Sequence, residues 1–220
     1  YTSVVSSVVI VTTTPLWVAL ASPVTLKEPI TKRIIFGLVT ALGGTILIGF
    51  GDACEISASA LVCPPTESFF QQGAVIGDLL ALVGAWTAAG YVIIGRSLRD
   101  RLGLVPYISV VYSMAAVILG VMMVISGEKF WGFPPLTWLW LILLGIVPQL
   151  IGHSTFNWSL GFLPASIVAV TLLGEPVGSS ILAYIFLGET PGISTIIGGV
   201  MILAGIFIAS TNIGKSDQIV

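Results

Sequence analysis

Glu175 and Pro176 stand together inside an apolar segment, where both residue types are costly. Glu175 is the only charged residue between Pro164 and Leu187. A carboxylate within a membrane helix usually faces a cavity or a partner, and proline cannot donate the backbone hydrogen bond to the carbonyl of Leu172. The pair could therefore hold a polar ligand or a proton beside a freed carbonyl. The alternative is structural: Glu175 bonds a neighbouring helix and fixes a bend.

A second polar group contains His153, the only histidine of the chain, together with Gln149 and Asn157. Because these residues are spaced by four, they share one face of a helix, and Trp158 follows at once. We expect this face to line a substrate cavity, although each member could equally make an interhelical hydrogen bond. With a single histidine, the segment does not predict a metal site.

Three aromatic residues fall well inside apolar runs: Trp17, Trp86 and Tyr91. They either form cavity walls against a substrate or pack against neighbouring helices. Cys54 and Cys63 lie in a polar stretch, where an oxidising compartment permits a disulfide; two free thiols are the alternative.

The composition places these residues in a membrane protein. Of the 220 residues, 56% are hydrophobic and 8% are charged, whereas soluble domains carry about 25% charged residues. A helix needs about 20 mostly apolar residues to cross the hydrocarbon core, and the apolar runs here are too uniform for barrel strands. The sequence therefore predicts an all-α integral membrane fold. Its transmembrane helices are expected at 3–26, 34–51, 75–96, 104–126, 136–158, 164–187 and 192–211.

The basic residues indicate the orientation of these spans. One side of the predicted membrane carries Lys27, Lys32, Arg33, Arg96, Arg99, Arg101 and Lys215, and the other side carries Lys129 alone. The positive-inside rule makes the first side cytoplasmic. We therefore expect a multi-pass protein of the cell membrane with its C-terminus in the cytoplasm.

An internal repeat relates each residue n to residue n + 161. This offset superposes identical residues, among them Pro15 on Pro176, Glu28 on Glu189, Gly37 on Gly198 and Gly44 on Gly205. Thr14 falls on Glu175 and offers a neutral hydroxyl at the equivalent position. We interpret the two prolines as structural, because both copies carry the same break in the helix. The glycines are spaced by seven, so each pair lies on one helix face, where small residues let membrane helices approach closely.

The two copies are expected to run in opposite directions, because Glu28 and Glu189 fall on opposite sides of the membrane in the predicted topology. Inverted repeats are typical of secondary transporters. Three spans precede the second pair of helices, and completing the first copy in the same way requires about 80 to 90 further N-terminal residues. The expected whole is ten helices in two inverted units of five.

Four stretches resemble the EamA family of the drug/metabolite transporter superfamily. They are TTTPLWVALASPVTLKE at 12–28, GDLLALVGAWTAAGYVIIGRSLRD at 77–100, LIGHSTFNWSLGFLPASIVAV at 150–170 and LLGEPVGSSILAYIFLGE at 172–189. The resemblance implies a first EamA repeat ending at 1–51, an extracytoplasmic loop at 52–74, a second repeat at 75–211 and a cytoplasmic tail at 212–220. Because most of the first repeat is absent, the isolated chain is not expected to transport. The loop with its two cysteines also departs from the family pattern.

The leading functional prediction is a secondary permease. The resemblance implies export or exchange of a small metabolite such as an amino acid. Two inverted units indicate alternating access, Glu175 makes a proton a possible coupling ion, and no cofactor is expected. A seven-helix receptor and a non-transporting membrane subunit are the alternatives. An enzyme is not expected, because no nucleophile, base or metal ligands cluster. The near-neutral charge and the lack of a basic stripe also argue against a nucleic-acid partner.

Overall fold

The computed structural model describes residues 4–53, 55–57, 60–62 and 72–211. The chain divides into two compact units, of which the first comprises residues 1–93 and 163–220 and the second residues 94–162. Cys54 and Cys63, for which we considered a disulfide, lie outside the described residues.

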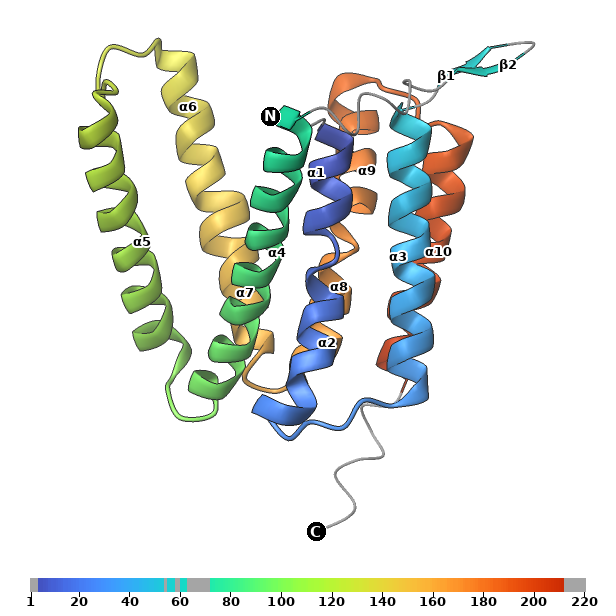
Figure 1. The fold of residues 1–220 in the computed structure, drawn as a ribbon. Helices are drawn as coiled ribbons and strands as arrows, with labels where there is room; N and C mark the ends of the chain where they lie inside the picture. The colour runs from blue at the N-terminus through green and yellow to red at the C-terminus, as the bar shows by residue number, and fades with distance from the viewer. Residues whose placement is uncertain (1–3, 54, 58–59, 63–71, 212–220) are drawn as a thin grey trace. The chain divides into compact units, whose positions relative to one another are not determined.

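The first unit contains three consecutive helices from each end of the chain and most of a seventh helix (Figure 1). The N-terminal helices are α1 (Val4–Val11), α2 (Thr14–Thr25) and α3 (Lys32–Ala53). The C-terminal helices are α8 (Ala165–Leu172), α9 (Glu175–Leu187) and α10 (Ile193–Ser210). The remaining helix is α4 (Gln72–Arg99), which continues into the second unit.

The second unit is a pair of long membrane segments joined to the end of α4. The first segment is α5 (Leu104–Ser126), which ends on Gly127 in the left-handed conformation that glycine favours. The second segment runs without interruption through α6 (Pro135–Leu144), the π-helical stretch η2 (Gly145–His153) and α7 (Ser154–Ser159). Pro148 lies inside η2, and π-helical turns are rare and frequently mark functional sites.

The predicted membrane fold is confirmed. Within the described residues, seven helical segments are long and apolar enough to cross a membrane: 6–25, 32–51, 75–99, 104–126, 135–159, 165–187 and 193–210. Helix α3 continues through Ala53, and α4 is described from Gln72. Between them, strands β1 (Glu55–Ser57) and β2 (Ala60–Val62) pair in antiparallel register.

The internal repeat reappears in the helix boundaries of the first unit. With the same offset of 161, the end of α1 matches that of α8, and α2 and α3 start where α9 and α10 start. The matching residues are Val11 and Leu172, Thr14 and Glu175, and Lys32 and Ile193. In Figure 1, α1 and α2 descend while α8 and α9 ascend, so these helix groups have opposite directions.

The turns that follow α2 and α9 are equivalent as well. Lys27 has a positive φ of 59° and its counterpart Gly188 a φ of 69°. The amide of Glu28 donates to Ser22 O at 3.4 Å, and the amide of Glu189 donates to Ala183 O at 3.3 Å. Both helices therefore end with a residue in the left-handed conformation, and in both the amide of the next residue donates to a carbonyl of the last helical turns. The two copies thus share backbone geometry where their side chains differ.

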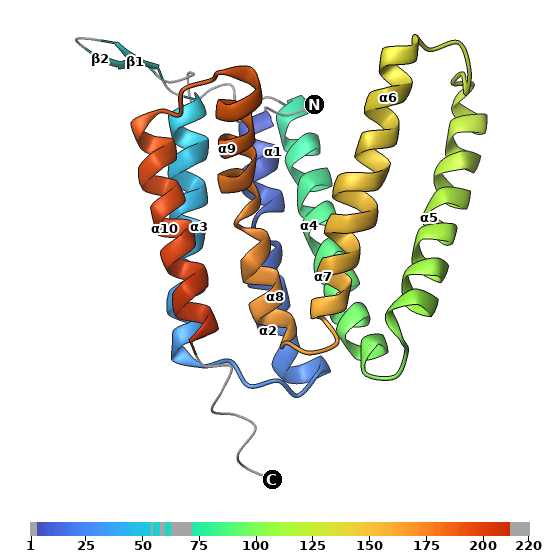
Figure 2. The same ribbon diagram turned by 180° about the vertical axis from the view of Figure 1, so that it is seen from behind.

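Helices α3 and α10 pack directly against each other, and they lie side by side in both Figure 1 and Figure 2. A Cβ atom added to Gly37 would lie 2.5 Å from Gly205 O, and one added to Gly198 would lie 2.5 Å from Gly44 O. These glycines therefore bring the two backbones into contact, as membrane helices do when small residues line their interface. All four glycines that the repeat relates lie in this contact.

Candidate functional site

Two membrane segments of the first unit are interrupted at equivalent positions. The break between α1 and α2 covers Thr12 and Thr13, and the break between α8 and α9 covers Leu173 and Gly174. In the first break the amide of Thr13 donates to Ile10 O at 3.1 Å, and in the second the amide of Gly174 donates to Thr171 O at 3.0 Å. Each break tightens into a three-residue turn just before its proline, because Pro15 and Pro176 cannot donate to the turn before them.

In the first break, side-chain hydroxyl groups donate hydrogen bonds to backbone carbonyls. Thr14 is buried, and its Oγ1 donates to Val11 O at 2.7 Å, the carbonyl that Pro15 cannot reach with a backbone N–H. The same hydroxyl lies 3.4 Å from Ala85 O on α4. Thr13 Oγ1 donates to Ile10 O at 2.6 Å. The freed carbonyls of this break are therefore occupied by side chains of the break itself.

The second break has a carboxylate where the first has a hydroxyl. Glu175 is the first residue of α9, and its side chain is exposed. Its backbone carbonyl accepts a hydrogen bond from Ser179 Oγ at 2.8 Å. Pro176 leaves Leu172 O without its usual helical donor, and an ionised carboxylate has no proton to give. The two breaks thus share geometry and differ in proton-donating capacity.

Aromatic side chains lie beside the first break. The rings of Trp17 and Trp86 meet edge to face, with centroids 5.5 Å apart and planes at 88°. Trp17 Nε1 donates to Thr13 Oγ1 at 3.0 Å, which fixes the orientation of the ring. Trp86 is 48% exposed, and Tyr91 is half-buried on the same helix. The structure therefore brings Trp17, Trp86 and Thr14 together around α4.

The polar group of the second unit is divided by the π-helical stretch. Gln149 and His153 belong to η2 and are exposed, whereas Asn157 belongs to α7 and is fully buried. Tyr112 Oη lies 3.4 Å from Gln149 O and 3.2 Å from Ser154 Oγ. Trp158 packs on Phe162 with ring centroids 4.9 Å apart. Gln149 and His153 thus lie in π-helical turns and Asn157 in the α-helix that follows, so the spacing of four covers two helix types.

Two arginines connect the end of α4 to the end of α7, although their positions in the sequence predicted only a role in membrane orientation. Arg99 Nε donates to Asn157 O at 3.0 Å, and Arg96 Nη1 donates to Leu160 O at 3.2 Å. Arg96 also pairs with Asp100. The guanidinium groups thus satisfy carbonyls that the end of a helix leaves without donors. Their position at a basic turn was visible in the sequence, but their partners were not.

Glu28 was likewise missed as a contact residue. Its Oε2 accepts a hydrogen bond of 2.8 Å from the amide of Ala165, the first residue of α8. On α1, Ser6 Oγ donates to Asp78 Oδ1 of α4 at 2.7 Å. The repeat singled out Glu28 through its match with Glu189, yet only the packed first unit shows which helix it reaches.

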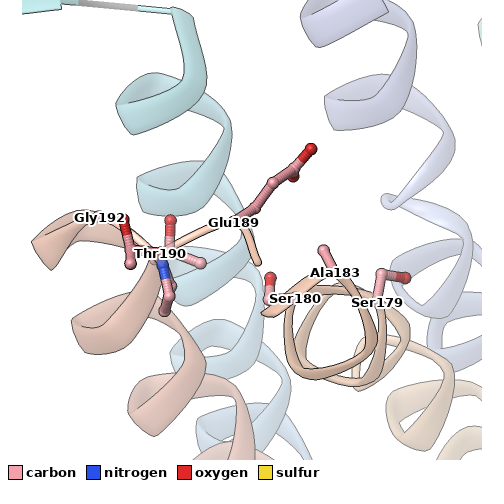
Figure 3. Close-up of a pocket in the computed structure, with 8 residues that line it drawn as sticks. Ser179, Ser180, Ala183, Glu189, Thr190 and Gly192 are labelled. Atoms are coloured by element: carbon pink, nitrogen blue, oxygen red, sulfur yellow. The ribbon is translucent and has the colours of Figure 1, made fainter. Parts of the chain in front are cut away.

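A surface pocket of about 290 Å³ lies where α9 turns into α10 (Figure 3). It is lined by Ser179, Ser180, Ala183, Glu189, Thr190, Pro191, Gly192 and Thr195. In Figure 3 the Glu189 side chain extends away from Ser179 and Ser180. None of the residues predicted to contact substrate lines this pocket. Across the described residues, no group of three or more potential metal ligands occurs.

The chain is similar to proteins described as transporters. A sequence model described as the EamA-like transporter family matches residues 75–211. An "Uncharacterized transporter" of Archaeoglobus fulgidus is 36% identical over 73 residues, which cover 33% of this chain and 27% of that protein. The "Uncharacterized transporter YdfC" of Bacillus subtilis is 22% identical over 210 residues, which cover 96% of this chain and 63% of YdfC. The chain thus spans less than two thirds of either relative.

A solved structure shares the fold. It is described as "Crystal structure of protein", is 20% identical, and superposes with a TM-score of 0.73 over 94% of this chain and 67% of its own chain. At this identity the likeness concerns the arrangement of helices alone.

Proposed function

Because this chain belongs to the EamA-like transporter family, whose sequence model matches residues 75–211, we propose that it is part of a secondary transporter. The protein would move a small metabolite such as an amino acid out of the cell by alternating access. The chain itself is a multi-pass membrane protein with seven segments able to span the bilayer among its described residues.

The observation that carries this proposal is the pair of equivalent helix breaks in the first unit. Broken membrane helices expose backbone carbonyls and helix ends, and transporters built from inverted repeats use such breaks to bind substrates and ions near the membrane midplane. Here the breaks precede Thr14 and Glu175, which are related by the repeat, and the helices that carry them run in opposite directions. A receptor has no equal need for this arrangement.

We assign substrate contacts in the first unit to Glu175, Thr14, Trp17, Trp86 and Tyr91. The carboxylate of Glu175 suits the amino group of a metabolite, while the Trp17 and Trp86 rings offer an aromatic surface. The edge-to-face geometry at 5.5 Å and the hydrogen bond to Thr13 hold Trp17 in place before a substrate arrives. In the second unit, Gln149, His153, Asn157 and Trp158 are the proposed contact residues.

The same proposal includes the whole architecture. Residues 75–211 supply five membrane segments, and α1 to α3 match the last two of them in their helix boundaries. We assign α1 to α3 to a first unit of the same kind, which gives ten helices in all. The positive-inside rule places the basic turns, and with them the C-terminus, in the cytoplasm.

Proton coupling follows from the difference between the two breaks. Thr14 Oγ1 donates to Val11 O at 2.7 Å, and a protonated Glu175 would have an O–H with which to reach the equivalent Leu172 O. Loss of the proton would release this carbonyl and the carboxylate together. Glu175 would thus exchange a proton for a cationic substrate group during each cycle.

An export assay tests the proposed function. Cells that express the complete reading frame would be loaded with a panel of labelled amino acids and related metabolites, and the release of each would be followed over time. We expect at least one solute to leave faster than from cells with an empty vector. If the protein is present in the membrane and every solute is released at the same rate as from empty-vector cells, the proposal is refuted.

A further inference from the structure

A second cavity adjoins the pocket at the α9–α10 turn. The pocket described above, with a volume of about 290 Å³, is the polar pocket, and an apolar groove of about 420 Å³ lies between α9 and α10. Ser180, Pro191 and Thr195 line both cavities. Most of the other groove residues are apolar or aromatic, among them Val177, Ile181, Tyr184 and Leu203. The two cavities therefore form one site with a polar end at the turn and an apolar end along the membrane segments.

The repeat shows that the groove is a feature of the second copy. At three groove positions the second copy has a smaller or more polar residue than the first. These pairs are Gly199 for Leu38, Ser180 for Ala19 and Thr195 for Ile34. The three side chains of the first copy are buried, whereas a Cβ added to Gly199 would meet Val177 Cγ2 first, at 3.6 Å. The second copy thus has space and two hydroxyl groups where the first copy is filled by apolar side chains.

The expected ten-helix architecture leaves the groove accessible to lipid. In the first copy, α4 contacts Ser6, Thr14 and Trp17. Their counterparts on α8 and α9 are Ile167, Glu175 and Gly178, and none of these residues lines the groove. A helix that packs on the second copy as α4 packs on the first would therefore not cover the groove.

The length of the groove suits a lipid chain. Between Thr195 and Leu203, α10 rises about 12 Å, so the groove lies within one leaflet of a hydrocarbon core about 30 Å thick. In a bilayer, such a groove gains a bound chain through close van der Waals contact. A polar pocket at its outer end is where the head group of the same lipid would lie.

The charge of the polar pocket selects the head group. Glu189 lines this pocket, and its exposed side chain extends from the turn away from Ser180 (Figure 3). None of the described residues that line the two cavities is basic. A carboxylate accepts hydrogen bonds from an ammonium group, whereas an anionic head group would find no charged partner here. The Thr195 hydroxyl and the first amides of α10, which lack partners within the helix, can donate to a phosphate.

From this site we propose that the chain binds a zwitterionic membrane lipid with a primary-amine head group, such as phosphatidylethanolamine. The ammonium group pairs with Glu189, and one acyl chain fills the groove beside Gly199. None of the residues assigned to substrate contact lines either cavity. The lipid site is therefore separate from the proposed transport pathway and does not depend on it.

Native mass spectrometry of the complete, delipidated protein in detergent tests the proposal. The probes are phosphatidylethanolamine, phosphatidylcholine and phosphatidylglycerol with identical acyl chains. The second has a quaternary ammonium group without N–H donors, and the third has no cation. We expect saturable binding of one phosphatidylethanolamine, up to about five-fold tighter than of the other two lipids, as for an exposed ion pair.

Two variants separate the head-group contact from the groove. Glu189→Gln keeps the size of the side chain and should remove the preference for phosphatidylethanolamine. Gly199→Leu introduces the residue of the first copy and should lower the binding of phosphatidylethanolamine to that of phosphatidylglycerol. If Gly199→Leu does not fold, Val200→Trp fills the same groove from a position that is 63% exposed.

Matched controls place the same changes elsewhere. Glu128→Gln alters an exposed carboxylate outside both cavities. Gly120→Leu fills a hollow of α5 whose lining residues include no hydroxyl or carboxylate. Both controls should bind phosphatidylethanolamine as the wild type does.

Three results would overturn the proposal. Equal binding of the three lipids, or tightest binding of phosphatidylglycerol, would refute the pairing with Glu189. Phosphatidylethanolamine binding that survives both groove variants would place the lipid elsewhere. A wild-type dimer that is lost in Gly199→Leu would assign the groove to a second copy of the chain.

Discussion

At the scale of single residues, positions 14 and 175 distinguish two otherwise equivalent helix breaks. Each precedes a proline, and each opens the helix that follows. The Thr14 hydroxyl donates a hydrogen bond to Val11 O, the carbonyl that Pro15 leaves free. A carboxyl group such as that of Glu175 can donate a hydrogen bond only in its protonated form. The first break is thereby closed by its own hydroxyl, whereas the second has a carboxylate at the equivalent position.

The hydroxyl of Thr14 should stabilise the first break. Thr14→Val keeps the shape of the side chain but leaves Val11 O without its donor in a buried position, and an unsatisfied buried polar group costs about 1–3 kcal/mol. We expect a lower midpoint of thermal unfolding in detergent for Thr14→Val and a nearly unchanged midpoint for Thr14→Ser. Equal midpoints for the two variants would show that the hydroxyl contributes nothing to stability.

Glu175 should carry the pH dependence of transport. Glu175→Gln keeps the size of the side chain and always presents an N–H donor, so protonation can no longer alter this position. For a solute that passes the export assay, we expect the rate of Glu175→Gln to be constant across a pH series in which the wild-type rate varies. A Glu175→Gln profile that follows the wild type would place proton coupling elsewhere.

At the scale of elements, the contact between α3 and α10 is built on glycine. The close pairs are Gly37 with Gly205 and Gly44 with Gly198, and the repeat exchanges one pair for the other. The interface is therefore made of two equivalent halves. Flanking apolar residues, among them Ala41 and Ile202, are buried against it. A membrane interface of this kind gains its stability from close van der Waals contact, because lipid offers no hydrophobic drive between helices.

Added volume at this interface should be destabilising. In Gly37→Ala the new Cβ would lie 2.5 Å from Gly205 O, a backbone atom that cannot move away alone. Such overpacking costs about 1–3 kcal/mol. The matched control is Gly120→Ala in α5, where a Cβ meets nothing within 4 Å. We expect the thermal midpoint to fall for Gly37→Ala and to stay level or rise for the control, since alanine favours helix by up to about 1 kcal/mol. Similar midpoints for both variants would contradict the close contact.

At the scale of the whole molecule, the inverted relation between the two ends of the chain depends on an odd number of spans between them. Three segments, at 75–99, 104–126 and 135–159, separate α3 from α8. In the predicted topology the second copy consequently enters the membrane from the side opposite to the first. The turns after α2 and after α9 lie at opposite ends of the first unit (Figure 1), and we expect them to face different compartments.

Reporter fusions should reveal this orientation. A fluorescent protein fused after Val220 should fluoresce, and alkaline phosphatase fused after Lys129 should be active, because the basic turns are expected in the cytoplasm. Phosphatase fused after Arg101 should be inactive. An active fusion at Arg101 together with an inactive one at Lys129 would reverse the orientation, and all the assignments of inner and outer face with it.

The amino-acid order by itself determined the membrane fold, the seven spans and the repeat, because length, apolar composition and the positions of proline and glycine act along the chain. It also singled out position 175, where one copy has a carboxylate and the other copy has the hydroxyl of Thr14. Tertiary structure alone decided which groups meet. Glu28 reaches Ala165 across 137 positions, and Gly37 faces Gly205 rather than its own repeat counterpart Gly198. Such partners depend on how helices pack in space, and no periodicity within one segment specifies them. The π-helical stretch at 145–153 could not be predicted either, because its backbone hydrogen-bonding pattern is one that side-chain spacing does not record.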